Sequence, residues 1–268
     1  MHGSILPYSL PHRGFPITAA QAFALVRERK AYLMRWESGF DDAAEGAWWH
    51  LIKDSDPALS ALSPKTRNQV KKGLRSCRVE GCDRSLIMEK GYPVYASAYE
   101  RYETFERKFS RDEFSSAVHA MPSDIEFWGV FDDNGALVGF GENIVDGNAC
   151  FYSTMWFTPE ALKNYASYAM IHCMNTHYLE ERGFRFVSDG ARSISHDTGI
   201  HQFLEQKFGF RKAYCRLNVV YSPLVGAAVA GAFPLRRQLG GLVRSSRFDV
   251  LMRQEELRRE SKRGLGNA

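Results

Sequence analysis

Two acidic residues stand in stretches of sequence where a charge is unusual. Glu142 lies inside a predicted strand, in the sequence Gly-Phe-Gly-Glu-Asn of residues 139–143. Asp189 ends a short apolar run directly before Gly190. A carboxylate among glycines and aromatic rings loses solvation, which raises its pKa toward values useful for accepting a proton. We interpret Glu142 as a candidate general base, with Gly141 leaving room for a substrate, and Asp189 as a residue that orients the substrate. The plainer alternatives are a solvent-facing Glu142 and an Asp189 that caps a turn.

Other residue types that could do chemistry are less specific. Tyr152 and Tyr214 lie in strand-like segments and are candidate proton donors, although a tyrosine in a strand is more often part of the core. Four of the eight histidines form two pairs five residues apart. His172 and His177 lie on different faces of a predicted helix, and His196 and His201 straddle a loop, where they could form only a weak site with Asp197. No ligand spacing of a known zinc site occurs, and neither does a Gly-x-Ser-x-Gly or a phosphate-binding P-loop motif. The sequence therefore predicts no metal.

The elements that would position these residues are clearest in the second half of the chain. Alternating apolar residues predict strands, and Asn134-Gly135 is the strongest short hairpin signal. A helix that starts at Pro159 crosses to the next strand, which must therefore run parallel to the strand before it. The predicted strands cover residues 125–131, 137–145, 149–157, 184–187 and 211–221, and the predicted helices cover 158–181 and 200–208. This order predicts an α+β fold in which an antiparallel meander is followed by a parallel strand.

The rest of the chain predicts two flanking segments. Residues 19–29 show helical spacing after Thr18, and the apolar runs 31–36 and 48–52 suggest a hairpin. We therefore expect an N-terminal helix-and-hairpin extension (1–62), a central domain (63–222) and a basic helical C-terminal tail (223–268). From Pro223 onward the chain has nine basic and four acidic residues. Such a tail suits contact with an anionic membrane surface, or packing of a helix against the domain.

Composition limits the class of protein. The chain has 268 residues, 44% hydrophobic and 25% charged, with 18 Phe, 12 Tyr and 5 Trp, enough to bury a sizeable core. The five cysteines form no C-x-x-C pair and are odd in number, unlike a secreted disulfide framework. The N-terminus does not read as a signal peptide, and no stretch approaches the length of a spanning helix. We expect a cytoplasmic protein.

The element order and several phrases resemble a known family. Residues 203–211, Phe-Leu-Glu-Gln-Lys-Phe-Gly-Phe-Arg, close a helix on Gly209-Phe210 before the last strand. Together with the strand–strand–strand–helix–strand–helix–strand order, this resembles the GNAT superfamily of acyl-CoA-dependent N-acyltransferases. The Fem-type branch, which includes the aminoacyl transferases of peptidoglycan bridges, is more similar still. Its members have a helix like residues 66–74, a crossover helix starting as at Pro159, and a strand ending as at Asp189-Gly190. The similarity covers residues 63–221.

The resemblance implies a GNAT-like mixed sheet flanked by helices, with the reactive cleft between the last meander strand and the parallel strand. Backbone N–H groups at Met155, Trp156 and Phe157 would line one lip and those of residues 188–190 the other. The phosphates of acyl-CoA, most simply acetyl-CoA, would lie over the N-terminus of the crossover helix, at Lys163, Asn164 and Tyr165. Two departures stand out. Residues 158–166 lack the glycines of the family's pyrophosphate loop, and Glu205 stands where many members have tyrosine.

These observations predict an N-acyltransferase that moves an acyl group from acyl-CoA to the primary amine of a small molecule or peptide. A Fem-type transfer from aminoacyl-tRNA is the alternative, favoured by the missing glycines and by a helix with basic and no acidic residues (Lys65, Arg67, Lys71, Lys72, Arg75, Arg78). That basic helix also has an ordinary explanation as a solvated face. A third hypothesis is a non-catalytic GNAT-like protein that binds a partner through its tail. The oligomeric state is not predicted.

Overall fold

The computed structural model describes residues 3–42, 45–55, 58–101, 107–194, 199–239 and 246–263. The chain divides into two compact units, each assembled from separate stretches of sequence. The first unit comprises Met1–Leu51, Ala191–Ile200 and Arg211–Ala268, and the second comprises Ile52–Gly190 and His201–Phe210. This division differs from the predicted succession of extension (1–62), central domain (63–222) and tail (223–268), because both ends of the chain fold together.

The second unit contains the predicted meander and its parallel partner. Strands β4 (Arg78–Cys82), β5 (Ile125–Phe131), β6 (Leu137–Asp146) and β7 (Ala149–Phe157) pair antiparallel in that order, and β8 (Phe186–Ala191) pairs parallel with β7. The turn between β5 and β6 uses Gly135 in the left-handed region, at φ 77°, as the Asn-Gly signal predicts. The structure confirms the α+β fold that the element order predicts, with a sheet of mixed parallel and antiparallel strands.

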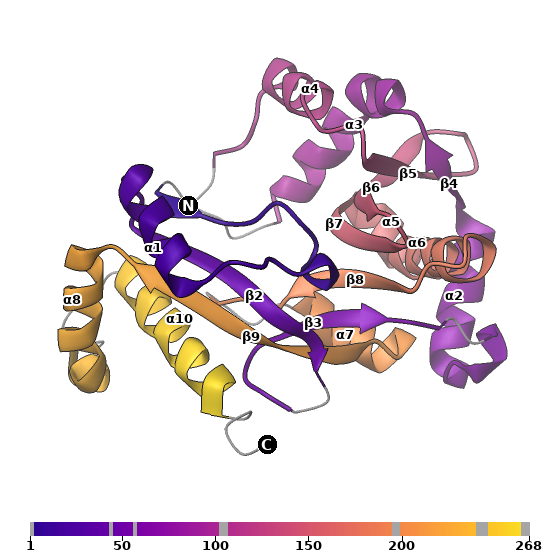
Figure 1. Ribbon diagram of the computed structural model, residues 1–268. Helices are drawn as coiled ribbons and strands as arrows, with labels where there is room; N and C mark the ends of the chain where they lie inside the picture. Colours follow the sequence, from indigo (N-terminus) through magenta and orange to yellow (C-terminus); the bar gives the residue numbers. More distant parts are fainter. Residues whose placement is uncertain are drawn as a thin grey trace. The chain divides into compact units, whose positions relative to one another are not determined.

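Helices cover both faces of this sheet (Figure 1). Helices α3 (Arg84–Tyr99) and α4 (Arg111–His119) pack on the face that carries Phe127 and Phe140. Helix α6 (Ala166–Asn175) buries Met170 and Met174 on the other face. The basic helix α2 (Pro64–Ser76) lies against α6. This unit also contains the short η2 (Leu59–Ala61) and α5 (Pro159–Lys163) and, shared with the first unit, α7 (Gly199–Phe208).

The crossover helix is not the single helix predicted over residues 158–181. Helix α5 ends at Lys163, Tyr165 adopts left-handed backbone angles (φ 62°, ψ 28°), and α6 starts at Ala166. Beyond α6 the chain continues as the π-helix η3 (Thr176–Glu181). Close packing accompanies the break, because a Cβ at Gly73 of α2 would lie 2.4 Å from the backbone oxygen of Tyr165. Periodicity alone cannot show such a break, since the same apolar face continues across it.

The first unit has its own set of paired strands. Strand β2 (Leu33–Asp42) pairs parallel with β1 (Ser4–Ile5) and antiparallel with β9 (Arg211–Tyr221). On the other side of β9, the N–H of Cys215 donates to the carbonyl of Trp48, which immediately precedes β3 (Trp49–Lys53), at 3.1 Å. The hairpin predicted from residues 31–36 and 48–52 is therefore not formed, because β9 lies between these strands. Strand β9 is distant in sequence but pairs with β2 in place of the local partner, because four of its side chains are buried in the core. These side chains are Ala213, Cys215, Leu217 and Val219.

Helices cover both faces of these strands. Helix α1 (Ala19–Glu28) packs Ala22 and Val26 on one face, and α10 (Ser246–Arg263) buries Leu257 completely on the other. The Oγ of Ser261 accepts a hydrogen bond from the N–H of Leu217 in β9 at 3.2 Å. Helix α10 therefore belongs to the core of this unit, next to β9 and α8 (Pro223–Ala232) (Figure 1). The short elements are η1 (Pro11–Arg13), η4 (Phe233–Leu235) and α9 (Arg236–Leu239). None of the helices in the described part of the chain could cross a bilayer.

Candidate functional site

The parallel strands β7 and β8 separate in the second unit. Their pairing runs from Ala149 with Phe186 to Phe151 with Ser188, and β7 then continues to Phe157 without β8 beside it in register. Where parallel strands separate, backbone N–H and C=O groups between them are free to meet a ligand at the carboxyl ends of the strands. The predicted splay is thus present, with Met155, Trp156 and Phe157 on the β7 side and Asp189-Gly190 on the β8 side.

Strand β7 carries a bulge at the start of the splay. Glu142 pairs with Thr154 and Asn143 pairs with Tyr152, so Ser153 is one extra residue on β7. A bulge leaves its extra residue unpaired in the ladder and turns the strand, and bulges are enriched beside active sites. Ser153 is exposed. The backbone at Ser153 is therefore a further source of hydrogen-bond donors at this end of β7, one that periodicity in the sequence does not show.

Asp189 is the buried acid at the end of β8. Burial raises the pKa of its carboxyl to about 7. The Nε2 atom of His201, on α7, lies 3.4 Å from its Oδ2 atom, and both side chains are largely buried. Gly190 follows with φ 88°, and a Cβ there would lie 2.6 Å from the ring of Phe151, so only glycine fits. Asp189 stands out in the sequence, but its neighbour His201 does not, because the two residues are twelve positions apart on different elements.

Glu142 is also buried, with only 8% of its surface exposed. Burial raises the pKa of its carboxyl, although the Oγ1 of Thr154 donates a hydrogen bond to Oε2 at 2.6 Å and opposes that shift. From the sequence we expected its neighbour Gly141 to leave room for a substrate, and the structure shows that it does not. A Cβ there would lie 2.8 Å from the methyl group of Met170, so the space belongs to the core.

The two candidate carboxylates face different helices. Glu142 pairs with Phe127, a member of the core cluster under α3 and α4. Asp189 meets His201 of α7, a helix whose Phe208 packs against Tyr168 of α6. Glu142 and Asp189 therefore lie on opposite faces of the sheet, and the structure does not bring them together around one substrate atom.

The tyrosines are separated as well. The hydroxyl of Tyr152 is buried and donates to Oδ1 of Asn175 at 2.9 Å, which is the structural role that we gave as the plainer alternative. Tyr214 is half-buried on β9, in the first unit.

The junction between α5 and α6 holds the residues predicted to contact phosphates. Lys163 is the last residue of α5 and Asn164 is its C-cap, so they are not in a first helical turn. The positive helix end that follows them belongs to α6, whose N-cap is Tyr165. Because β7 leads directly into α5, this junction follows the same end of β7 at which β8 separates.

Two backbone N–H groups at this junction have no hydrogen-bond acceptor among the described residues. The N–H groups of Asn164 and Tyr165 donate to carbonyls of α5, whereas those of Ala166 and Ser167 meet no acceptor among the described residues. Lys163 is exposed nearby. Lys72 of α2 lies over the ring of Tyr165, with its Nζ 5.1 Å from the ring centroid. The junction thus combines a helix N-terminus with two ammonium groups, which suits an anion.

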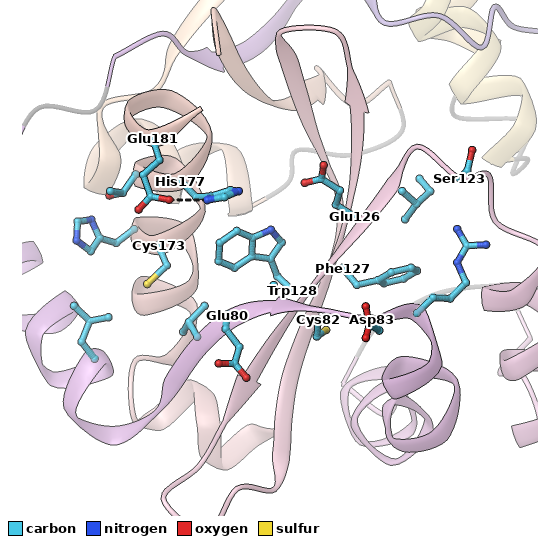
Figure 2. A pocket seen from close by; sticks show the side chains of 17 residues that line it. Glu80, Cys82, Asp83, Ser123, Glu126, Phe127, Trp128, Cys173, His177 and Glu181 are labelled. Carbon is cyan, nitrogen blue, oxygen red and sulfur yellow. Dashed lines mark hydrogen bonds and ion pairs between the residues drawn. The ribbon is translucent and has the colours of Figure 1, made fainter. Parts of the chain in front are cut away.

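A separate and wider groove, of about 970 Å³, lies between β4, β5 and the α6–η3 helix (Figure 2). Three of its four carboxylates are paired: Glu181 with His177 at 2.8 Å, Glu126 with Arg182 at 2.7 Å, and Glu80 with Arg78. The Nε1–H of Trp128 on its floor donates to the buried hydroxyl of Tyr178. We do not place the chemistry there, because β6 separates the strands β4 and β5 of this groove from the splay of β7 and β8. Among the described residues, no three His, Cys, Asp or Glu side chains converge as metal ligands would.

Comparisons with known proteins bear on the fold. No family model and no curated protein matches the sequence. Among solved structures, FemX superposes with a TM-score of 0.53 at 14% identity, covering 78% of each chain. A domain named as the C-terminal part of a lysylphosphatidylglycerol synthetase from Agrobacterium fabrum gives a TM-score of 0.55 at 16% identity, over 82% of this chain and 78% of that chain.

The chain shares its fold with FemX. The resemblance drawn from residues 63–221 is therefore confirmed at the level of the fold. The superposition extends further, because the matched share of the chain exceeds that segment. At sequence identities of 14% and 16%, the structural similarity supports the fold alone, so the chemistry has to be inferred from the side chains.

Proposed function

We propose that this protein is an N-acyltransferase that moves an acyl group to a primary amine, with Asp189 as the base. The observation that carries the proposal is a buried carboxyl with a pKa near 7, held beside His201 where β7 and β8 separate. A group with that pKa changes charge at neutral pH, as a general base must. The Fem-type fold supports acyl transfer as the reaction class.

The reaction requires three events that the site can serve. An alkyl amine with a pKa near 10 is charged at neutral pH and must lose a proton, which ionised Asp189 accepts. The neutral nitrogen then attacks the acyl carbon, and backbone N–H groups in the splay stabilise the resulting oxyanion. The bond to the leaving group breaks as the amide forms, and the leaving sulfur or oxygen takes up a proton. The attacking nitrogen releases its second proton as the amide forms, and this proton balances the one that the leaving group takes up.

Glu142 has a different part in this proposal. Its carboxylate accepts the hydrogen bond of Thr154 directly next to the Ser153 bulge. It therefore acts as a positioning residue, which holds the β7 backbone in the shape that presents its donors. This reverses the assignment made from the sequence, in which Glu142 was the base and Asp189 oriented the amine.

We propose acyl-CoA as the donor, with its phosphates at the α5–α6 junction. The N–H group of the half-buried Ser167, with Lys163 and Lys72, offers one backbone donor and two positive charges to a pyrophosphate. Met155, Trp156 and Phe157 would flank the acyl chain along β7. Tyr165 supplies the left-handed backbone turn that glycines supply in the family's pyrophosphate loop.

Aminoacyl-tRNA is the second candidate donor, and one observation favours it. Helix α2 presents exposed Lys65, Lys71, Lys72 and Arg75, and Lys72 is the residue that lies over Tyr165. At 1.5 Å per residue this basic row is about 15 Å long. Such a length exceeds one pyrophosphate and suits the spaced phosphates of a nucleic acid strand.

Release of free thiol from acetyl-CoA in the presence of a panel of primary amines tests the reaction. Asp189→Asn should lower turnover by about 10²–10⁴-fold with donor affinity unchanged, the range expected for a lost general base. The matched control is Asp133→Asn, at an exposed turn position, which should keep full turnover. In the wild type, turnover should fall below about pH 7 as Asp189 becomes protonated. Full activity of Asp189→Asn across pH 6–9 would remove Asp189 from the mechanism.

Calorimetry with CoA and filter binding with aminoacyl-tRNA separate the two donors. Lys163→Glu should weaken CoA binding by about 1–3 kcal/mol, the scale of a charge-assisted hydrogen bond, and Lys90→Glu on α3 should not. If the donor is aminoacyl-tRNA, Lys71→Glu with Arg75→Glu should weaken binding of the RNA and leave CoA binding unchanged. Absence of CoA binding to the wild type would reject the first donor.

A further inference from the structure

Strand β4 is the last strand at its end of the sheet. It pairs antiparallel with β5 over five residues without a bulge, and no strand lies on its other side in the described part of the chain. In an antiparallel ladder, every second residue directs its N–H and C=O groups away from the partner strand. No described residue hydrogen-bonds to these outward groups of Arg78–Cys82. The outer edge of β4 can therefore accept a further strand.

The wide groove of about 970 Å³ shown in Figure 2 adjoins this strand. Its lining includes Gly81 and Leu74, and Leu74 is 40% exposed. A Cβ placed on Gly81 would meet only the carbonyl oxygen of Phe127 among the described atoms, at 4.0 Å. Gly81 pairs with Trp128, whose ring contacts His177 of η3, so this free space lies on the face that the α6–η3 helix covers. The groove therefore has room for a large side chain above Gly81.

Asp83 is the one carboxylate of this groove that is not ion-paired among the described residues. It is exposed and directly follows β4, at the N-cap position of α3. Its side chain accepts no cap hydrogen bond there. The guanidinium of the adjacent Arg84 donates instead to three backbone carbonyls at and after the end of α4 (His119, Met121, Pro122). Asp83 can therefore accept hydrogen bonds from a cationic side chain of a ligand.

We infer that β4 binds an extended segment of a partner protein, which adds to the sheet as a further antiparallel strand. The five residues of β4 span about 17 Å, which accommodates five residues of the segment. The first of these lies opposite Cys82 and next to Asp83, so lysine or arginine suits this position. The second and fourth lie opposite Gly81 and Val79, on the face of the α6–η3 helix, so apolar side chains suit them.

A second copy of this chain fits the edge less well. If two copies of β4 paired antiparallel over all five residues, Glu80 of one copy would lie directly opposite Glu80 of the other. Like charges in directly opposed positions destabilise a strand pair. A segment that begins with a basic residue has the complementary charge for Asp83 instead.

Fluorescence anisotropy with the full-length protein and a synthetic peptide tests this inference. The probe is Lys-Val-Thr-Val-Thr with blocked ends and fluorescein on a linker after its last residue. We expect a Kd of about 100 µM or below, and binding weaker by at least about 10-fold when glutamate replaces the lysine. Absence of saturable binding would overturn the site, and equal binding of the two peptides would overturn the role of Asp83.

Two methylated forms of the probe test the strand pairing itself. In one form the backbone nitrogens of the first, third and fifth residues are methylated, and in the other those of the second and fourth. Only one of these sets donates to β4, because alternate residues of a strand point their N–H groups to opposite sides. One form should therefore bind at least about 10-fold more weakly and the other within about 2-fold of the probe. Equal effects of the two sets would refute strand addition.

Two variants locate the peptide. Asp83→Lys should weaken the lysine probe by at least about 10-fold and strengthen the glutamate peptide, whereas Asp112→Lys, at an exposed position of α4, should do neither. Gly81→Leu should weaken both peptides, because its side chain fills the space beside Trp128. Undiminished binding of the lysine probe by Asp83→Lys or by Gly81→Leu would place the peptide elsewhere and refute the inference.

Sedimentation velocity of the protein alone tests the second copy as the occupant. We expect a monomer at micromolar concentration, with or without the probe. A dimer that the probe dissociates would assign the edge of β4 to a second copy and overturn the partner. The outcome is independent of the acyltransferase proposal, because none of these measurements involves acyl donor or turnover.

Discussion

Replacing Asp189 by Asn should change the pH dependence of stability in a direction that the structure dictates. The carboxyl of Asp189 has a pKa of about 7 in the folded protein and ionises near its ordinary value of 3.8 in the unfolded chain. The folded state therefore holds this proton more tightly. The stability that this provides is complete below pH 3.8 and is lost as the pH rises through 7.

The magnitude follows from the interval that can be studied without acid unfolding. Between pH 5 and pH 7 the wild type loses about 1.4 kcal/mol per pH unit from this group, or about 3 kcal/mol, and nothing more from it above pH 7. Asn has no such titration. The free energy of unfolding of Asp189→Asn minus that of the wild type should therefore be about 3 kcal/mol higher at pH 8 than at pH 5, which means that the variant gains stability relative to the wild type as the pH rises.

Urea unfolding of both proteins at pH 5 and pH 8 measures this difference, and any packing cost of Asn cancels because it is present at both pH values. Asp133→Asn, at an exposed turn, is the control and should show a difference that stays constant within about 0.5 kcal/mol. A constant difference for Asp189→Asn would mean that its carboxyl is already ionised at pH 5. A change of the opposite sign would mean that Asp189 and His201 form a stable ion pair, and either result would refute the raised pKa.

Two further comparisons test the packing inside each unit. Gly190→Ala should cost about 2–4 kcal/mol of stability, because its Cβ would meet the ring of Phe151, whereas Gly183→Ala, also at positive φ but in open space, should cost about 1 kcal/mol. Equal costs would show that Phe151 moves aside. Leu257→Ala should cost about 2–5 kcal/mol because α10 buries this side chain, whereas the exposed Leu224→Ala should change stability by less than 0.5 kcal/mol. Thermal or urea unfolding measures all four, and a neutral Leu257→Ala would mean that α10 is not part of the core.

Several strands were predictable because their signals are local. The bounds of β5 and β7 agree with the predicted residues 125–131 and 149–157, and those of β9 agree with residues 211–221. Alternation with a period of two, ended by Asn134-Gly135, is enough to place such strands. The order of these elements then led to the Fem-type resemblance, which the superpositions confirm for the fold.

The pairing of the first unit was not predictable from such signals. Residues 31–36 and 48–52 look like a hairpin locally, and the competitor that pairs with β2 instead starts at Arg211. Helix α10 has a charged composition typical of a solvated tail, yet it buries Leu257 and Ser261. Its charges are satisfied along its own surface, where Glu255 accepts hydrogen bonds from Arg258 and Arg259. Composition does not distinguish charges that face water from charges paired over a buried helix.

The candidate site was predictable in part, for a physical reason. A carboxylate at the end of an apolar strand shows in the sequence, and so Asp189 was found. Its partner His201 and the bulge at Ser153 arise from tertiary contacts, which have no periodicity. Gly141 illustrates the converse error: a glycine beside a candidate base can leave room for a substrate or for a core side chain, and here Met170 fills the space.

The stability cost and the proposed chemistry of Asp189 have the same origin. Burial beside His201 raises the free energy of the ionised carboxylate. The same effect gives the carboxyl a pKa near 7, at which it can take a proton from an amine and lose it again. A solvated aspartate would be too weak a base to do this, because its pKa lies near 3.9. Gly190 contributes by keeping β8 within contact of Phe151, which holds the end of the strand, and with it Asp189, in the buried position. The proposal therefore requires that variants which relax this strand end lower the pKa of Asp189 and the turnover together.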